Sequence, residues 1–139
     1  MIVVFDNNIV MDALTDRAGA EEARALIDAV ADDRIVGVVT ANSLTDIYYI
    51  ARKQIGAAAA RAAIQNLMVL FSVAAVDEEI CSAAAWSYME DFEDAVVNAC
   101  AKAIEADYIV TRDAAFQKSE FAAVPVVSPR RMLEILERL

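Results

Sequence analysis

Short apolar runs alternate with longer amphipathic stretches along this chain. The apolar runs are rich in β-branched residues, as expected for strands buried on both faces of a sheet. They predict strands over residues 2–5, 34–40, 71–76, 108–111 and 124–128. The stretches between them carry apolar residues at helical spacing. They predict helices over residues 7–14, 19–33, 42–55, 56–70 and 77–90, another after residue 91, and a closing one from residue 129.

Several residues are placed to begin or end these helices. Asn7 is a candidate N-cap for the first helix, and either Asn42 or Ser43 for the third. Gly56 is expected to end one helix and let the next begin. Pro129 suits the first turn of the closing helix.

The alternation of strands and helices predicts an α/β fold. We expect a three-layer sandwich, in which a mostly parallel sheet of four to five strands is flanked by helices. The length of 139 residues is usual for one domain, and no internal repeat or low-complexity linker divides it. We therefore expect a single domain over residues 1–139.

The charge balance is strongly acidic, with 22 Asp and Glu against 12 Lys and Arg and a formal net charge of −10. A broadly basic surface for nucleic acid or anionic membrane is therefore excluded. A phosphate-rich substrate would need clustered arginines, a basic partner or bound divalent cations. No apolar run approaches the length of a membrane span, and the first residues lack the basic segment of a signal peptide. We expect a cytoplasmic protein.

The chain contains no histidine, which removes the commonest zinc ligand and the commonest general base at neutral pH. Cys81 and Cys100 lie in apolar helical stretches without the spacing of a zinc or redox site. We expect both to be buried as small hydrophobic residues. Any catalytic chemistry must therefore use carboxylates.

Acidic residues follow two of the predicted strands. Asp6 comes directly after the first strand, and Asp113 lies just past the fourth. Functional groups of open α/β sheets gather outside the carboxyl ends of the strands, so these two acids would meet if their strands are neighbours. Asp91, Asp94 and Asn98 share one face of a helix near its first turn. Capping and interaction with the helix dipole are an alternative role for those acids.

Asp46, within the helix predicted over residues 42–55, is the fourth candidate, with a solvated acid as the alternative interpretation. Carboxylates that converge without a balancing cation repel one another. Oxygen ligands without sulphur or imidazole suit Mg²⁺ or Mn²⁺, and Mg²⁺ keeps positions for water and phosphate oxygens. The acids together predict a divalent-cation site.

The order and spacing of these acids resemble the PIN domain family, the nuclease fold of VapC-type toxins in bacterial toxin–antitoxin pairs. The resemblance covers nearly the whole chain. It rests on the segment DNNIVMD from Asp6, on Asp46 in SLTDIYYIARK, and on DAVVNACAKAIEADYIVTRD from Asp94 to Asp113. Asn7 stands where the family usually has Ser or Thr, and Asp46 where glutamate is more frequent.

The resemblance implies catalytic roles for four acids, Asp6, Asp46, Asp94 and Asp113. Three of them, Asp6, Asp94 and Asp113, would hold Mg²⁺ or Mn²⁺. Asp46 would position a second metal ion or the attacking water. Asp91 and Glu93 are alternatives for the role of Asp94.

Polar residues beside the acids have supporting roles in this interpretation. The resemblance implies that Asn8 orients the first acid by a hydrogen bond and that Thr111 lines the site. Arg112 follows Thr111 and is the best placed basic residue for a phosphate contact. Asp12 is assigned mainly to structure, because its helical position lies beyond that of Asp6.

Other basic and aromatic residues are less specific. Candidates for phosphate contacts, with solvated surface charge as the alternative, are Arg52, Lys53, Arg61 and Lys118. Aromatic residues expected in the core or a subunit interface, with base stacking as the alternative, are Tyr48, Tyr49 and Trp86.

The resulting hypothesis is a metal-dependent endoribonuclease. The resemblance implies RNA as substrate, a toxin role, an antitoxin protein as partner and a homodimer. The alternative is a catalytically inactive PIN-fold module that binds RNA or protein. A receiver-like signalling domain is disfavoured, because Ala74 and Ala75 occupy the region of its phosphoacceptor. A phosphatase of the haloacid dehalogenase type would need an acid at Asn8.

Overall fold

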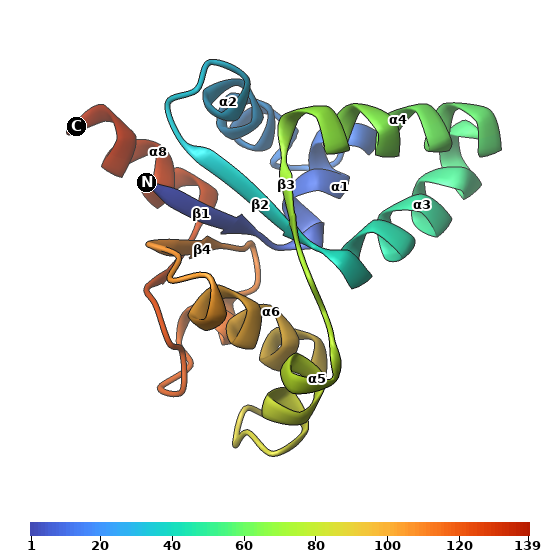
Figure 1. Ribbon diagram of the computed structural model, residues 1–139. Coiled ribbons are helices and arrows are strands. Elements are labelled where there is room, and N and C mark those ends of the chain that lie inside the picture. The colour runs from blue at the N-terminus through green and yellow to red at the C-terminus, as the bar shows by residue number, and fades with distance from the viewer.

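A five-stranded parallel sheet runs through the centre of the protein, whose computed structural model describes residues 1–139 (Figure 1). The strands are β1 (Ile2–Phe5), β2 (Val36–Thr40), β3 (Ser72–Ala74), β4 (Tyr108–Val110) and β5 (Val126–Val127). Their order in the sheet is β3-β2-β1-β4-β5, and every neighbouring pair is parallel. The predicted parallel α/β architecture is confirmed.

Eight helices connect and cover the strands. They are α1 (Asn7–Thr15), α2 (Ala20–Ala31), α3 (Ala41–Ile55), α4 (Ala57–Leu70), α5 (Glu78–Ala85), α6 (Phe92–Ala103), α7 (Ala114–Gln117) and α8 (Pro129–Glu137). In Figure 1, α5 and α6 lie across the sheet from α1, α2, α3 and α4. None of the helices has both the length and the apolar character needed to cross a membrane.

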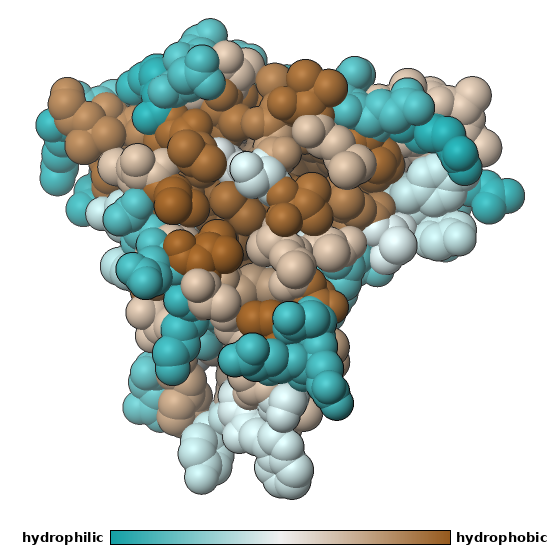
Figure 2. All heavy atoms as spheres, in the orientation of Figure 1, coloured by the Kyte–Doolittle hydropathy of each residue, from teal (hydrophilic) through white to brown (hydrophobic).

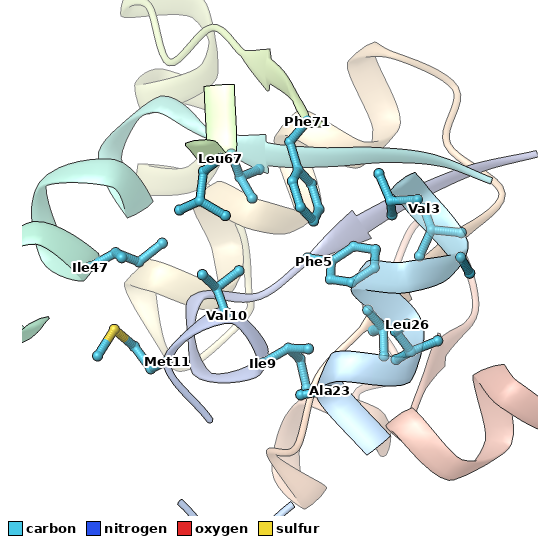
Figure 3. Close-up of a cluster of buried hydrophobic side chains, with 14 of the residues drawn as sticks. Val3, Phe5, Ile9, Val10, Met11, Ala23, Leu26, Ile47, Leu67 and Phe71 are labelled. Carbon is cyan, nitrogen blue, oxygen red and sulfur yellow. The ribbon is translucent and has the colours of Figure 1, made fainter. Parts of the chain in front are cut away.

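Hydrophobic clusters fill both faces of the sheet. The larger one contains 19 buried residues from the sheet, α1, α2, α3, α4 and α8, and Figure 3 shows part of it. Within it the rings of Phe5 and Phe71 meet edge to face, with centroids 5.0 Å apart. The second cluster contains 13 buried residues, mainly from the sheet, α5 and α6. Val3 belongs to the first cluster and Val4 to the second, so β1 must be apolar at successive positions.

Apolar surface is also exposed near β3, the edge strand. Figure 2 shows a broad hydrophobic area on the face that carries β2, β3 and the end of α4. Exposed apolar residues of these elements are Val36, Met68, Val69, Leu70 and Val73. An exposed area of this kind is typical of protein–protein contacts.

The predicted element boundaries fail mainly at turns and caps. Asp6, not Asn7, caps α1, and α3 begins directly after Thr40, so neither Asn42 nor Ser43 is its N-cap. In both cases the strand runs straight into the helix, which makes the residue at the junction the cap. Gly56 separates α3 from α4 with a positive φ of 86°, as predicted.

Two further helical predictions need correction. The helix predicted over residues 77–90 ends at Ala85, and α7 forms where a loop was expected. The expected burial of Cys81 is also wrong. Cys81 is exposed because α5 packs through Ile80 and Ala84, whereas Cys100 is buried as predicted.

Trp86 and Tyr49 lie outside the core, at 84% and 58% exposed, so the subunit interface is the part of that expectation that stays a prediction. Tyr48 is partly buried against the larger cluster.

Candidate active site

The pairing of β1 with β4 brings the first and last acids of the predicted site to one edge of the sheet. Phe5 is paired with Val110, and the backbone N–H of Asp6 donates to the carbonyl of Val110 at 3.0 Å. Asp113 follows three residues later as the N-cap of α7. The condition on which the meeting of these two acids depended, that their strands are neighbours, is therefore met.

Asp6 is held in one orientation by its surroundings. It is only 9% exposed, and its Oδ1 accepts from the backbone N–H of Asn7 at 2.8 Å. The Thr111 hydroxyl donates to Asp6 Oδ2 at 2.8 Å. The Asn8 amide nitrogen donates to the same carboxylate oxygen at 3.4 Å and to the Thr111 hydroxyl oxygen at 3.2 Å. Asn8 and Thr111 thus lie where the sequence placed them, beside the first acid.

Thr111 links the two acids that follow the strands. Its hydroxyl oxygen accepts from the backbone N–H of Asp113 at 3.1 Å while its proton goes to Asp6. Its carbonyl accepts from the side chain of Gln117 at 2.9 Å. The buried hydroxyl of Thr111 therefore bonds both to the side chain of Asp6 and to the backbone of Asp113.

The first turn of α6 supplies the next acids. Asp91 is the N-cap, and its Oδ1 accepts from the backbone N–H of Asp94 at 3.0 Å. The capping role considered for these acids therefore applies to Asp91. Asp91, Asp94 and Asp113 line one cavity of about 700 Å³, which we call the acidic cavity.

The electrostatics of these carboxylates show how strongly they affect one another. Burial, and after it the charges of Asp91, Asp6, Asp113 and Glu93, together raise the pKa of Asp94 to about 7. Burial also raises the pKa of Asp6, although the hydrogen bonds from Thr111 and Asn7 oppose that change. None of the ion pairs in the protein involves Asp6, Asp94 or Asp113.

Asp46 reaches this group through Glu93. The side chain of Asp46 on α3 interacts with that of Glu93 on α6, and this interaction is the main reason that the pKa of Glu93 is raised. The charges that act on both Asp6 and Asp94 include those of Asp91 and Asp113. The structure therefore brings Asp6, Asp91, Asp94 and Asp113 within range of one another's charge, and Asp46 joins this group through Glu93.

The donor chemistry fits a hard divalent cation. All the candidate ligands are carboxylate oxygens, the preferred ligands of Mg²⁺ and Mn²⁺. No ion pair within the chain neutralises Asp6, Asp94 or Asp113. No three acidic, histidine or cysteine side chains are gathered closely enough here to enclose a metal ion. Binding of one would therefore require the carboxylate side chains to turn toward it.

Arg112 is engaged within the chain. Its Nε lies 2.8 Å from Oδ2 of Asp12, whose side chain is 2% exposed, while the Arg112 side chain is 51% exposed. The other oxygen of Asp12 is buried without a hydrogen-bond partner. The backbone N–H of Arg112 donates to Asn8 Oδ1 at 3.3 Å. Asp12 thus anchors Arg112 beside the site, in agreement with its predicted structural role.

Two exposed aromatic residues of the acidic cavity were missed in the sequence. Tyr88 and Phe121 line it together with Lys118, whereas Trp86 does not. Tyr88 lies in the stretch predicted as helix 77–90, and Phe121 in an irregular segment, so no periodicity marked them. A second cavity of about 470 Å³, the α3–α4 groove, is lined by Tyr48, Tyr49 and Arg61, among others. Arg52 and Lys53 are exposed in the last turn of α3.

The fold and the carboxylates at the strand ends define a parallel α/β domain with an acidic site. Residues 2–115 match the PIN domain family. The chain belongs to the PIN domain family, which confirms the resemblance seen in its motifs.

Solved structures of toxin–antitoxin proteins share this fold. VapBC2 from Rickettsia felis, bound to a DNA fragment from its promoter, is 12% identical, with a TM-score of 0.69 over 92% of this chain and 98% of that chain. VapC20 from Mycobacterium tuberculosis, a toxin that cleaves the sarcin–ricin loop, is 16% identical, with a TM-score of 0.69 over 88% and 98%. A toxin–antitoxin complex from Klebsiella pneumoniae is 21% identical, with a TM-score of 0.65 over 91% and 97%. No curated protein matches the sequence.

Proposed function

We propose that this PIN domain is a divalent-metal-dependent endoribonuclease that hydrolyses phosphodiester bonds of RNA. The observation that carries the proposal is the gathering of Asp6, Asp94 and Asp113 beside Asp91, where burial and then the neighbouring charges raise the pKa of Asp94 to about 7. A protein maintains such an arrangement at a cost in stability. A bound cation would offset that cost and serve the chemistry.

The roles of the residues follow from their positions. Asp6, Asp94 and Asp113 would hold Mg²⁺ or Mn²⁺, with Asp6 oriented by Thr111 and Asn8. When bound, such a cation activates water and stabilises negative charge on the phosphate. Asp46, which joins this group through Glu93, would position a second cation or the attacking water.

A toxin role is proposed on the likeness of fold to the VapC and toxin–antitoxin structures. We propose an antitoxin protein as partner, a homodimer as assembly and a cytoplasmic location. The exposed apolar residues around β3 and the α3–α4 groove are surfaces that could contact another protein, which supports the proposal of a partner. The strong negative charge suits a basic partner.

The direct test is cleavage of cellular RNA by the purified chain in Mg²⁺, Mn²⁺ or EDTA. Wild type should cleave at discrete positions only with a divalent cation, and Asp6→Asn or Asp113→Asn should lower the rate by at least about 10-fold. Asp28→Asn is the matched control, because Asp28 is exposed on α2 away from the site. Equal cleavage by all variants would refute the proposal.

The alternative of an inactive binding module predicts a different result. RNA or a partner protein would bind, and metal would stabilise the protein, yet no RNA would be cleaved under any of these conditions.

A further inference from the structure

We propose that Tyr88 and Phe121 form a stacking site for one unpaired nucleobase of the substrate, next to the acidic group. This inference rests on the proposed function and concerns how the RNA is positioned. The two residues come from different segments, the turn before α6 and the loop between α7 and β5. They nevertheless line the same cavity as Asp94 and Asp113.

The two rings are arranged as an open platform. Their centroids are 6.0 Å apart and their planes differ by 39°. Tyr88 is 86% exposed and Phe121 is 48% exposed, so ring surface is accessible to a ligand. Exposed aromatic rings in a nucleic-acid site stack on bases, and stacking tolerates any base because each has a π face.

The platform is tied to the helix that carries Asp94. Asn98, one turn further along α6, donates from its amide nitrogen to the carbonyl of Phe121 at 3.3 Å. Its amide oxygen accepts from the backbone N–H of Ala123 at 2.8 Å. Asn98 is therefore a positioning residue, which holds the loop of Phe121 at a fixed place relative to the carboxylates.

The cavity also suits the rest of a nucleotide. Its volume of about 700 Å³ lies within the usual range of small-molecule sites. Lys118 lines it, is exposed and makes no ion pair within the chain. The other charged residues of the lining are acidic, so a phosphate there would need the cation of the proposed function as well as the charge of Lys118. The bases of an A-form duplex are stacked and inaccessible, so the ligand class is single-stranded RNA.

Binding to a labelled single-stranded RNA tests this site, with Asp94→Asn as the parent so that the RNA stays intact. Adding Tyr88→Ala or Phe121→Ala should weaken binding by about 10-fold or more, as loss of a stacking contact does. Tyr88→Phe should bind within about twofold of the parent. Trp86→Ala is the matched control, because Trp86 is as exposed as Tyr88 but lies outside the cavity.

A second experiment removes the bases of the RNA one at a time and measures binding of each abasic RNA. Its result would not depend on Tyr88 if that residue had only a structural role. One position should exist at which removing the base weakens binding as much as Tyr88→Ala. Combining the two changes should cost no more than either alone, because both remove the same contact. A flat scan, or full additivity at every position, would overturn the stacking site.

The outcomes separate this inference from the proposed function. If Tyr88→Ala and Phe121→Ala bind like the parent while wild type still cleaves RNA with metal, only the stacking site is wrong. If the parent binds no RNA and wild type cleaves none, both proposals fail. If Tyr88→Ala dissociates an oligomer in light scattering and the lost affinity returns at higher protein concentration, the rings form a protein contact and the inference is overturned.

Discussion

Replacing Asp94 by Asn should stabilise the metal-free protein at neutral and higher pH. The pKa of Asp94 is raised from 3.8 to about 7 in the folded protein, chiefly by burial and then by the neighbouring acids. The folded state therefore binds more protons than the unfolded state between these two values. Well below pH 3.8 Asp94 is protonated in both states and costs no stability. As the pH rises, the cost of ionising Asp94 in the folded protein lowers the free energy of unfolding, and this cost is nearly complete at about pH 7.

The size of the effect follows from opposing contributions. The difference between the two pKa values of Asp94 corresponds to about 4 kcal/mol for a fully shielded group. Asp94 is only partly buried, so solvent screening reduces this to roughly 1–2 kcal/mol. Loss of the favourable contact with the N-terminal end of α6 costs about 0.3–1 kcal/mol. The net gain for Asp94→Asn is about 1 kcal/mol, or roughly 4 °C in Tm.

Thermal unfolding in EDTA at pH 5 and at pH 8 measures this gain. Asp94→Asn should exceed wild type at pH 8 and approach it at pH 5, whereas Asp28→Asn should follow wild type at both. In Mn²⁺ at about 100 times its dissociation constant, wild type should gain about 2.7 kcal/mol and Asp94→Asn much less. If Asp94→Asn is less stable than wild type at pH 8, the favourable contact of Asp94 with the N-terminal end of α6 outweighs the cost of its buried charge, and the reasoning is refuted. Absence of any metal response in wild type would refute the cation site.

Other predictions concern the support of the site and the core. Thr111→Val should destabilise the protein by about 1–3 kcal/mol in chemical unfolding, because it leaves the buried Asp6 without its hydroxyl donor, whereas Thr111→Ser should retain most of the stability. Equal loss in both variants would assign the effect to packing. Arg112→Met should cost about 1–3 kcal/mol at pH 7 by leaving Asp12 buried and unpaired, and much of that loss should disappear in the double variant with Asp12→Asn. Gly37→Ala should cost about 1–3 kcal/mol, since a Cβ there would lie 2.7 Å from neighbouring side chains; unchanged unfolding would show that the core relaxes.

The fold was predictable because its strands are buried on both sides. Apolar runs such as residues 2–5 and the acid that ends each of two strands are local signals. The general rule for parallel sheets then placed Asp6 and Asp113 at one edge. The sheet order could not be read from the pattern, and the adjacency of β1 and β4, on which the site depends, comes from the structure.

The contacts around the site were not predictable, because they join side chains distant in sequence. Asp46 meets Glu93, and Tyr88 meets Phe121, across elements whose relative placement no periodicity encodes. The exposure of Cys81 was missed for a similar reason. An alanine-rich helix such as α5 has little contrast between its buried and exposed faces in the sequence.

Bringing the acids together costs stability, and this cost is offset more for Asp6, at the edge of the sheet, than for Asp94 on α6. Asp6 loses water on burial but gains donors from Thr111 and Asn7, which oppose the rise of its pKa. Asp94 has no comparable compensation among the causes of its raised pKa, all of which act in one direction. Asp6→Asn would therefore remove hydrogen bonds together with a charge, and the two effects on stability would oppose each other. Asp94→Asn removes mainly the charge, which makes it the cleaner probe of whether these carboxylates are arranged for a cation.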